Sequence, residues 1–252
     1  MVFLLAQTRV IACQLSRVHL SNGQRWASGI SLHGGAASPA SVFVVPTFEF
    51  VKRCFATFSR PQDLHRHRKR LEGFGKDATK GDTKILTAAH DLLRDEDWFA
   101  RKTAIDVIAK VAVANDSAQL AVLYKHMEDE DIFVREASVD AVAEVALPGD
   151  NLAIAKVATR LADEDCFVRT RAVVALARLG QKGDVETLGL LDEMFDDGFV
   201  PVRKKAVAAL VDLAHPGDEA VLGRIRRCLD DPDTGVRLEA KEALSKLRSS
   251  PS

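Results

Sequence analysis

The sequence has few cysteines, and their spacing does not suit a metal site or a disulfide framework. Four occur in 252 residues, and no two form a Cys-x-x-Cys pair: Cys13, Cys54, Cys166 and Cys228. This spacing indicates a reducing compartment. Cys166 and Cys228 fall in the repeated part of the chain described below, where we expect small buried thiols.

Long apolar runs and catalytic motifs are also missing. No stretch of 18 apolar residues occurs, so a membrane-spanning helix is not expected. A Gly-rich phosphate loop, a nucleophile elbow and a catalytic Cys/His signature are absent as well. The acidic cluster Glu128 to Asp131 lacks the turn-forming glycine and the distal glutamate of a calcium loop. The sequence therefore predicts no catalytic residue, no cofactor and no metal, and it favours a non-enzymatic protein.

Acidic residues are scarce in the first third of the chain. Residues 1–80 contain 12 Lys/Arg and 4 Asp/Glu, whereas residues 81–252 contain 23 and 32. Residues 1–60 are rich in Ser and bear several Arg, which is typical of a transit peptide for a mitochondrion or plastid. A poorly ordered tail or a mis-assigned translation start in a cytoplasmic protein is the alternative. Residues 61–80 include the basic run His65 to Arg70, which we interpret as a linker or a capping helix. Contact with nucleic acid or a nuclear address is the alternative for this run.

A motif that begins with Asp and ends with Arg returns every 34 residues from position 95 onward. Its aspartates and arginines are Asp95, Asp129, Asp163, Asp197, Asp231, Arg101, Arg135, Arg169, Arg203 and Arg237. A fixed period of this length predicts a repeat architecture. The repeats divide residues 81–250 into five units, which are 81–114, 115–148, 149–182, 183–216 and 217–250.

Each unit is predicted to be a pair of helices. It opens with Gly-Asp or Asn-Asp, where Gly or Asn adopts the left-handed conformation that ends one helix and Asp caps the next. Apolar residues at helical spacing then predict a first helix of about 10–11 residues and a second of about 14–16. Such helices are too short to be stable alone, so the units must stack. We expect an all-α fold, a right-handed α-solenoid of five antiparallel helix hairpins. We also expect it to be a monomer and to carry a poorly ordered N-terminal extension.

The third unit comes close to the pattern Asp-x-Asp-x-x-Val-Arg-x-x-Ala-x-x-Ala-Leu-x-x-Leu, from Asp163 to Leu179. This resembles the HEAT repeat family of armadillo-like helical proteins, in particular the short units of the phycobilisome-lyase type. The tetratricopeptide repeat has the same period, but its Trp, Gly, Tyr and Pro positions are absent. The resemblance implies that the repeated Asp accepts amides at the turn. It also implies that the repeated Arg donates hydrogen bonds across the boundary between units.

The same resemblance makes one enzyme a possibility to consider, deoxyhypusine hydroxylase, whose HEAT-like fold binds iron through His-Glu pairs. The repeats contain three histidines, and none is followed by Glu: His90, His126 and His215. An iron-dependent hydroxylase is therefore disfavoured.

Residues that vary between units are the candidates for function, because the repeated residues form the core and the joints. The second helices line the concave side in HEAT-like folds, and here they carry charges of both signs. The predicted partner-binding residues are Lys102, Asp106, Lys110, Glu136, Asp140, Glu144, Arg171, Arg178, Lys204 and Lys205. Mixed charge suits a folded protein partner, whereas nucleic acid would favour a continuous basic stripe. A merely solvated face is the alternative.

The leading hypothesis is a scaffold or adaptor that binds another protein. A phycobilin-lyase-like chromophore attachment factor or lyase subunit is a second hypothesis, although the resemblance transfers no chromophore-binding residue. A regulatory subunit of an enzyme is a third.

Overall fold

The computed structural model describes residues 79–249, which belong to the second of two compact units, Ser59–Ser252. The transit-peptide prediction for residues 1–60 lies outside the described residues. The prediction of a linker or capping helix lies almost wholly outside them, since only its last two residues are described.

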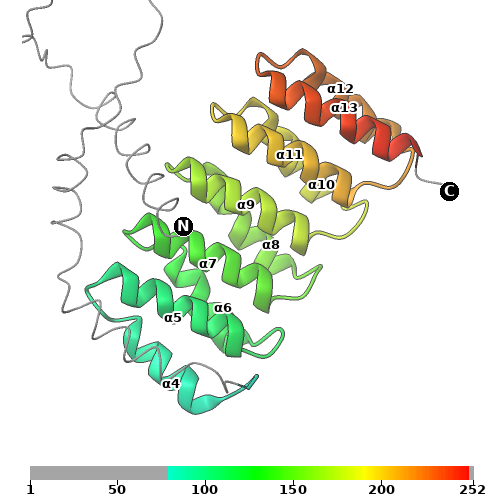
Figure 1. Cartoon of the computed structure of the whole chain (residues 1–252). Coiled ribbons are helices and arrows are strands. Elements are labelled where there is room, and N and C mark those ends of the chain that lie inside the picture. Colours follow the sequence, from blue (N-terminus) through cyan, green and yellow to red (C-terminus); the bar gives the residue numbers. More distant parts are fainter. Residues whose placement is uncertain (1–78, 250–252) are drawn as a thin grey trace, which may run out of the picture. The chain divides into compact units, whose positions relative to one another are not determined.

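The described residues form ten α-helices arranged as five stacked hairpins (Figure 1). The hairpins are α4 (Thr83–Leu92) with α5 (Trp98–Val111), α6 (Ser117–His126) with α7 (Ile132–Val145), α8 (Asn151–Ala158) with α9 (Cys166–Leu179), α10 (Val185–Glu193) with α11 (Val200–Leu213), and α12 (Glu219–Arg227) with α13 (Thr234–Ser249). The second helices α5, α7, α9, α11 and α13 pack against one another in that order. The predicted all-α solenoid is confirmed.

The first helices are shorter than the sequence suggested in the last three hairpins. α4 and α6 have ten residues, but α8 has eight and α10 and α12 have nine. In these three hairpins a 3₁₀ turn follows the α-helix, as η1 (Thr159–Ala162), η2 (Met194–Asp196) and η3 (Cys228–Asp230). Such a tightening is common at helix ends and brings the chain into the Asp turn.

The residue at the start of each hairpin forms a hydrogen bond with the end of the second helix of the same hairpin. Gly149 has a φ of +85°, and its amide donates a 2.6 Å hydrogen bond to the carbonyl of Leu179, the last residue of α9. Next to it, one carboxylate oxygen of Asp150 accepts the amides of Leu152 and Ala153 at 3.0 Å. The other four corners repeat the bond from the corner amide to a carbonyl near the end of the second helix, with Asn115 in place of glycine at the second. Three of them also repeat the cap with two amides, whereas Asp184 accepts the amide of Glu186 and the hydroxyl of Thr187. The predicted corner chemistry therefore also links the two ends of each hairpin.

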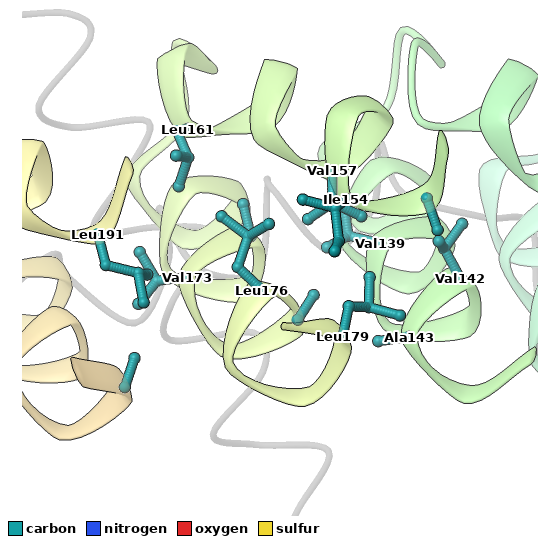
Figure 2. Packing of buried hydrophobic residues seen from close by; sticks show 14 of the residues in the cluster. Val139, Val142, Ala143, Ile154, Val157, Leu161, Val173, Leu176, Leu179 and Leu191 are labelled. Carbon is teal, nitrogen blue, oxygen red and sulfur yellow. The ribbon is translucent and has the colours of Figure 1, made fainter. Parts of the chain in front are cut away.

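The core is a continuous row of buried side chains along the stack (Figure 2). One repeat position on the second helices carries a small and fully buried side chain in all five units. The residues at this position are Ala104, Ser138, Ala172, Ala206 and Ala240. Near the end of each first helix one repeat position is apolar in all five units, and it is buried as Leu93, Met127, Leu161 and Phe195. In the last unit the residue at this position, Leu229, is only half-buried, while the adjacent Cys228 is buried. The expectation of a buried Cys166 is wrong, because this first residue of α9 is half-buried.

The outer side of α13 is polar where the equivalent side of α11 is apolar. Lys241 occupies the repeat position of the fully buried Val207, and Arg248 occupies that of Ala214. Both residues of α13 are exposed. A polar outer face is what a terminal repeat needs for solubility, so α12 and α13 act as a cap on the described stack.

Candidate partner-binding face

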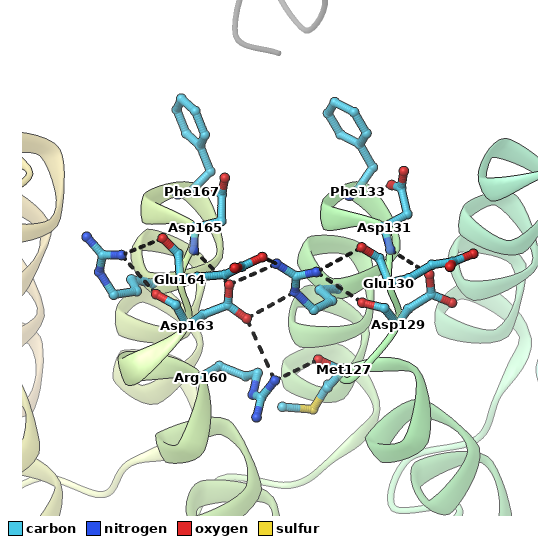
Figure 3. A network of polar contacts seen from close by, with 12 residues as sticks. Met127, Asp129, Glu130, Asp131, Phe133, Arg160, Asp163, Glu164, Asp165 and Phe167 are labelled. Atoms are coloured by element: carbon cyan, nitrogen blue, oxygen red, sulfur yellow. Dashed lines mark hydrogen bonds and ion pairs between the residues drawn. The ribbon is translucent and has the colours of Figure 1, made fainter. Parts of the chain in front are cut away.

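The repeated Asp and Arg form a ladder along the stack (Figure 3). The guanidinium of Arg135 donates from Nε and Nη2 to the two carboxylate oxygens of Asp163, both at 3.0 Å. Its Nη1 donates to the carbonyls of Asp129 and Glu130 in its own turn. The same two-oxygen contact joins Arg101 to Asp129, Arg169 to Asp197 and Arg203 to Asp231. The ladder therefore connects each hairpin to the next.

The two ends of the ladder differ from its centre. Asp95, at the first turn, accepts the amide of Asp97. Arg237, at the last turn, keeps the contacts to its own turn carbonyls but donates from Nη2 to the hydroxyl of Thr234 at 2.7 Å. Eight of the ten repeated Asp and Arg residues thus occupy joints between hairpins, Asp95 and Arg237 lie at the two ends of the ladder, and none of the ten lines the hollow described next.

Charge pairing shifts the pKa values in the ladder. The hydrogen bond with Asp129 raises the pKa of Arg101 against the opposing effect of burial. Burial acts to raise the pKa of Asp129, but the bonds from Arg101 and from the amide of Asp131 lower it overall. By contrast, burial raises the pKa of Asp131, the N-cap of α7. The surroundings of Asp129, the ladder residue, thus favour its ionised form. The surroundings of Asp131, the capping residue, disfavour its ionised form because it is buried.

The exposed sides of α5, α7, α9, α11 and α13 form the second-helix face, which carries the predicted partner-binding residues. Seven of these ten residues line one hollow of about 300 Å³ between α5, α7 and the start of α9, and they are Lys102, Asp106, Lys110, Glu136, Asp140, Glu144 and Arg171. The structure therefore brings most of the predicted set together around a single concavity.

Ion pairs connect several of the residues that line the hollow. On α5, Lys102 contacts Asp106 at 2.6 Å. From α9, Arg171 reaches back to α7, with Nη1 3.3 Å from Asp140 and Nε 3.8 Å from Glu136. Burial raises the pKa of Asp140, although the neighbouring Arg171 opposes the shift. Burial thus disfavours the charged form of this lining carboxylate, and a cation from the next hairpin partly offsets that effect.

The other three predicted residues lie further along the face. Arg178 is exposed on α9, and Lys204 and Lys205 begin the second turn of α11. Within residues 79–249, none of the three makes an ion pair. All three are outside the lining of the hollow.

Sequence reasoning missed the uncharged part of the hollow. Its lining also includes Phe133 and three alanines, Ala109, Ala137 and Ala141. The ring centroids of Trp98 and Phe133 are 4.8 Å apart. Figure 3 shows the side chains of Phe133 and Phe167 pointing away from the ladder in the same direction. The signal was present as an aromatic residue at the same repeat position in three units, Phe99, Phe133 and Phe167.

A second hollow, of about 750 Å³, lies between the first helices α8 and α10 and was not anticipated. Gly149, Ile154, Gln181, Asp184 and Leu190 are among its lining residues. Among the described residues, no helix has the length and apolar character to cross a bilayer, and no three His, Cys, Asp or Glu side chains are grouped so as to hold a metal ion.

Comparisons with known proteins identify the fold. No family model and no curated protein matches the sequence. Among solved structures, a designed armadillo repeat protein in complex with the peptide (KR)4 aligns with a TM-score of 0.51 at 21% identity, over 75% of this chain and 95% of that one. The complex of CpcE and CpcF of phycocyanin lyase from a Nostoc species aligns with a TM-score of 0.52 at 21% identity, over 70% of each chain.

A protein of Escherichia coli aligns with a TM-score of 0.53 at 17% identity, over 66% of this chain and 60% of that one. At these identities the likeness concerns the fold. The chain has an armadillo- or HEAT-like helical repeat fold.

Proposed function

We propose that this protein is a non-enzymatic scaffold or adaptor that binds another protein on the second-helix face. The observation that carries the proposal is the gathering of seven non-repeating charged residues around one hollow. Consecutive second helices pack closely, whereas consecutive first helices make few contacts. Such a difference curves a stack toward its second helices, which would make this face concave.

Two structural neighbours support a binding role. The designed armadillo repeat protein holds a peptide, and CpcE and CpcF form a complex with each other. Both show that stacked hairpins of this kind can present a surface to another chain. Mixed charge on such a surface gives specificity and register more than affinity.

The test is affinity capture with a variant in which four charges of the face are reversed together. The substitutions are Lys102→Glu, Glu136→Lys, Asp140→Lys and Arg171→Glu. Both members of the Arg171–Asp140 and Arg171–Glu136 pairs change sign, so these attractions are kept. Lys102→Glu places a carboxylate beside Asp106 on the same helix, but a like-charge pair at this spacing costs only about 0.2–0.5 kcal/mol, so the melting temperature should stay within a few degrees of the wild-type value. Loss of the captured partner at unchanged melting temperature is the expected result.

The matched control reverses Arg226 and Glu219, an exposed pair at 3.3 Å on α12. It should capture the partner as the wild type does. Equal capture by the fourfold variant and the control would refute a role for the second-helix face. The identity of the captured protein would also show whether the role is that of an enzyme's regulatory subunit.

A role in chromophore attachment is a second proposal, supported by the size of the hollow between α8 and α10. Its volume of about 750 Å³ falls in the range of small-molecule sites. Mixing the protein with a bilin and an acceptor protein should then change the bilin absorbance. Ala155 of α8 also lines the hollow, so Ala155→Trp should fill it and abolish the change. An absorbance spectrum unaffected by the protein would remove this alternative.

A further inference from the structure

The two ends of the described stack differ in character. At the C-terminal end, the exposed residues Lys241 and Arg248 make the outer side of α13 polar. At the N-terminal end, the first hairpin carries the apolar residues Ile85 and Val107, which are only half-buried. A terminal unit needs a polar outer side, so an apolar one requires a further element to cover it.

Ile85 and Val107 stand at two repeat positions that are buried in every later unit. Those residues are Gln119, Ala153, Thr187 and Val221 at the first position and Ala141, Ala175, Ala209 and Ala243 at the second. Only the first unit lacks a preceding hairpin within the described residues, so both positions face that side. Gln119 confirms the direction, because its amide oxygen lies 2.8 Å from Nε2 of His90 in the preceding hairpin. The first hairpin therefore has apolar side chains where a preceding element would pack.

The ladder is also incomplete at this end. Its four later aspartates each accept two bonds from the arginine that lies 28 residues earlier. Within residues 79–249, Asp95 is the one ladder aspartate without an arginine, and its Oδ1 accepts the amide of Asp97. The residue at the corresponding position before Asp95 is His67, which lies in the basic run His65 to Arg70. A carboxylate of the first hairpin thus has a basic residue of the preceding segment at the ladder spacing.

The repeat register continues backward into this segment. Asp63 stands at the repeat position of the helix cap Asp97, and Gly73 is a residue type that commonly ends a helix. Leu71 stands at the repeat position of Ile105, which is fully buried and is occupied by the exposed Lys241 in the last unit. A position that becomes polar only in the last unit faces the following hairpin. In this register Leu71 faces the first hairpin.

Arg66 and Arg70 depart from the repeat, and the departure has a physical reason. They stand at the repeat positions of Ala100 and Ala104. These positions are buried in the first and the last hairpins alike, so they are covered within their own hairpin rather than by a neighbour. A second helix without a first helix leaves both positions open to water, where arginine is well accommodated.

We propose that residues 63–72 form a half-unit that caps the N-terminal end of the stack. The half-unit is a single helix that packs against α5 as α5 packs against α7. Leu71 faces the side of the first hairpin that carries Ile85 and Val107, and His67 pairs with Asp95 as an additional step of the ladder. The basic residues at the open positions face water. This cap is independent of the proposed function, and removal of residues 1–60 would leave it in place.

Completing the ladder in the full chain tests the pairing. His67→Arg supplies the usual ladder residue and should raise the melting temperature by about 2–4 °C, the shift that a modest gain in stability produces in a chain of this size. Combination with Asp95→Asn should remove this gain. The matched control is His65→Arg, which adds the same side chain two residues away and should leave the melting temperature unchanged.

Hydrogen exchange in the full chain tests the packing. Leu71→Asp should speed exchange of the α4 and α5 amides several-fold, because it removes the apolar cover of the first hairpin. Arg70→Asp changes the adjacent residue, which faces water in this register, and should leave that exchange unchanged.

The outcomes separate the cap from other occupants of this side. Equal shifts from His67→Arg and His65→Arg, no gain from His67→Arg, or a gain that survives Asp95→Asn would overturn the pairing. Unchanged exchange in Leu71→Asp would overturn the cap and leave this side to another protein. A melting temperature that rises with protein concentration would place a second copy on this side and would also overturn the cap.

Discussion

Arg135 and Asp163 lie 28 residues apart in the sequence and form a two-bond pair between consecutive hairpins. Their side chains are 7% and 3% exposed. The carboxylate of Asp163 also accepts the amide of Asp165 at 2.9 Å, and Arg135 holds two carbonyls of its own turn. One buried pair thus fixes two turns and the position of one hairpin against the next.

Replacing Asp163 with Asn should destabilise the stack strongly. The variant leaves the buried guanidinium of Arg135 without its counter-charge, and loss of one member of a buried pair costs about 3–5 kcal/mol. Urea unfolding followed by circular dichroism at 222 nm measures this loss. Arg226→Gln, which breaks an exposed pair, serves as the control and should cost less than about 1 kcal/mol. Equal losses in the two variants would show that the ladder adds little to stability.

The ladder should also make stability depend on pH in the acidic range. The hydrogen bond from Arg203 lowers the pKa of Asp231 below the unfolded value near 3.9. A group with a lowered folded pKa stabilises the fold fully above its unfolded pKa, and this contribution disappears as pH falls through the folded pKa. The difference in unfolding free energy between wild type and Asp231→Asn should therefore be constant near neutrality and shrink below about pH 4. A difference that grew on acidification would contradict the direction of the shift.

The periodic features of the fold could be predicted from the sequence because each depends on residues close in the chain or repeated along it. The corner Gly-Asp, the apolar columns and the ladder Asp and Arg all recur at the same interval. The contact between Arg171 and Asp140 could not be predicted, because it joins residues that vary between units. The uncharged lining of the hollow was missed because a charge pattern does not reveal its three alanines and Phe133.

One departure from the repeat was visible in the sequence, and the structure shows its local effect. Phe199 stands where Asp97, Asp131, Asp165 and Asp233 stand in the other units, so α11 begins without a side-chain cap. Instead, the ring of Phe199 lies 5.7 Å from that of Phe167, edge to face. In the fourth unit, the contact between Phe199 and Phe167 of the preceding unit takes the place of the capping hydrogen bond that Asp makes in the other units. Comparing the units residue by residue does not predict this contact.

The stability of the protein should respond oppositely to alanine and to glycine at the corner residues that have a positive φ. Gly217 has a φ of +74° with open space around the position of a Cβ atom, so Gly217→Ala tests conformational strain alone and should cost about 1–2 kcal/mol. Asn115 adopts a φ of +57°, and Asn115→Gly should be neutral or slightly stabilising because glycine favours that region. Thermal unfolding of the two variants provides the comparison. A destabilised Asn115→Gly would mean that the asparagine side chain itself matters at the second corner.

Cys228 should resist alkylation in the folded protein. Burial raises the pKa of this thiol to about 11, and the nearby carboxylate of Asp231 adds to the shift. Because the thiolate is the reactive form, only about one molecule in a thousand carries it at pH 8. Iodoacetamide labelling followed by peptide mass spectrometry should therefore find Cys228 almost unmodified at pH 8 and fully modified in urea. Asp231→Asn removes the neighbouring charge and loosens the last ladder joint, so labelling of Cys228 should become faster, and an unchanged rate would show that burial alone protects the thiol.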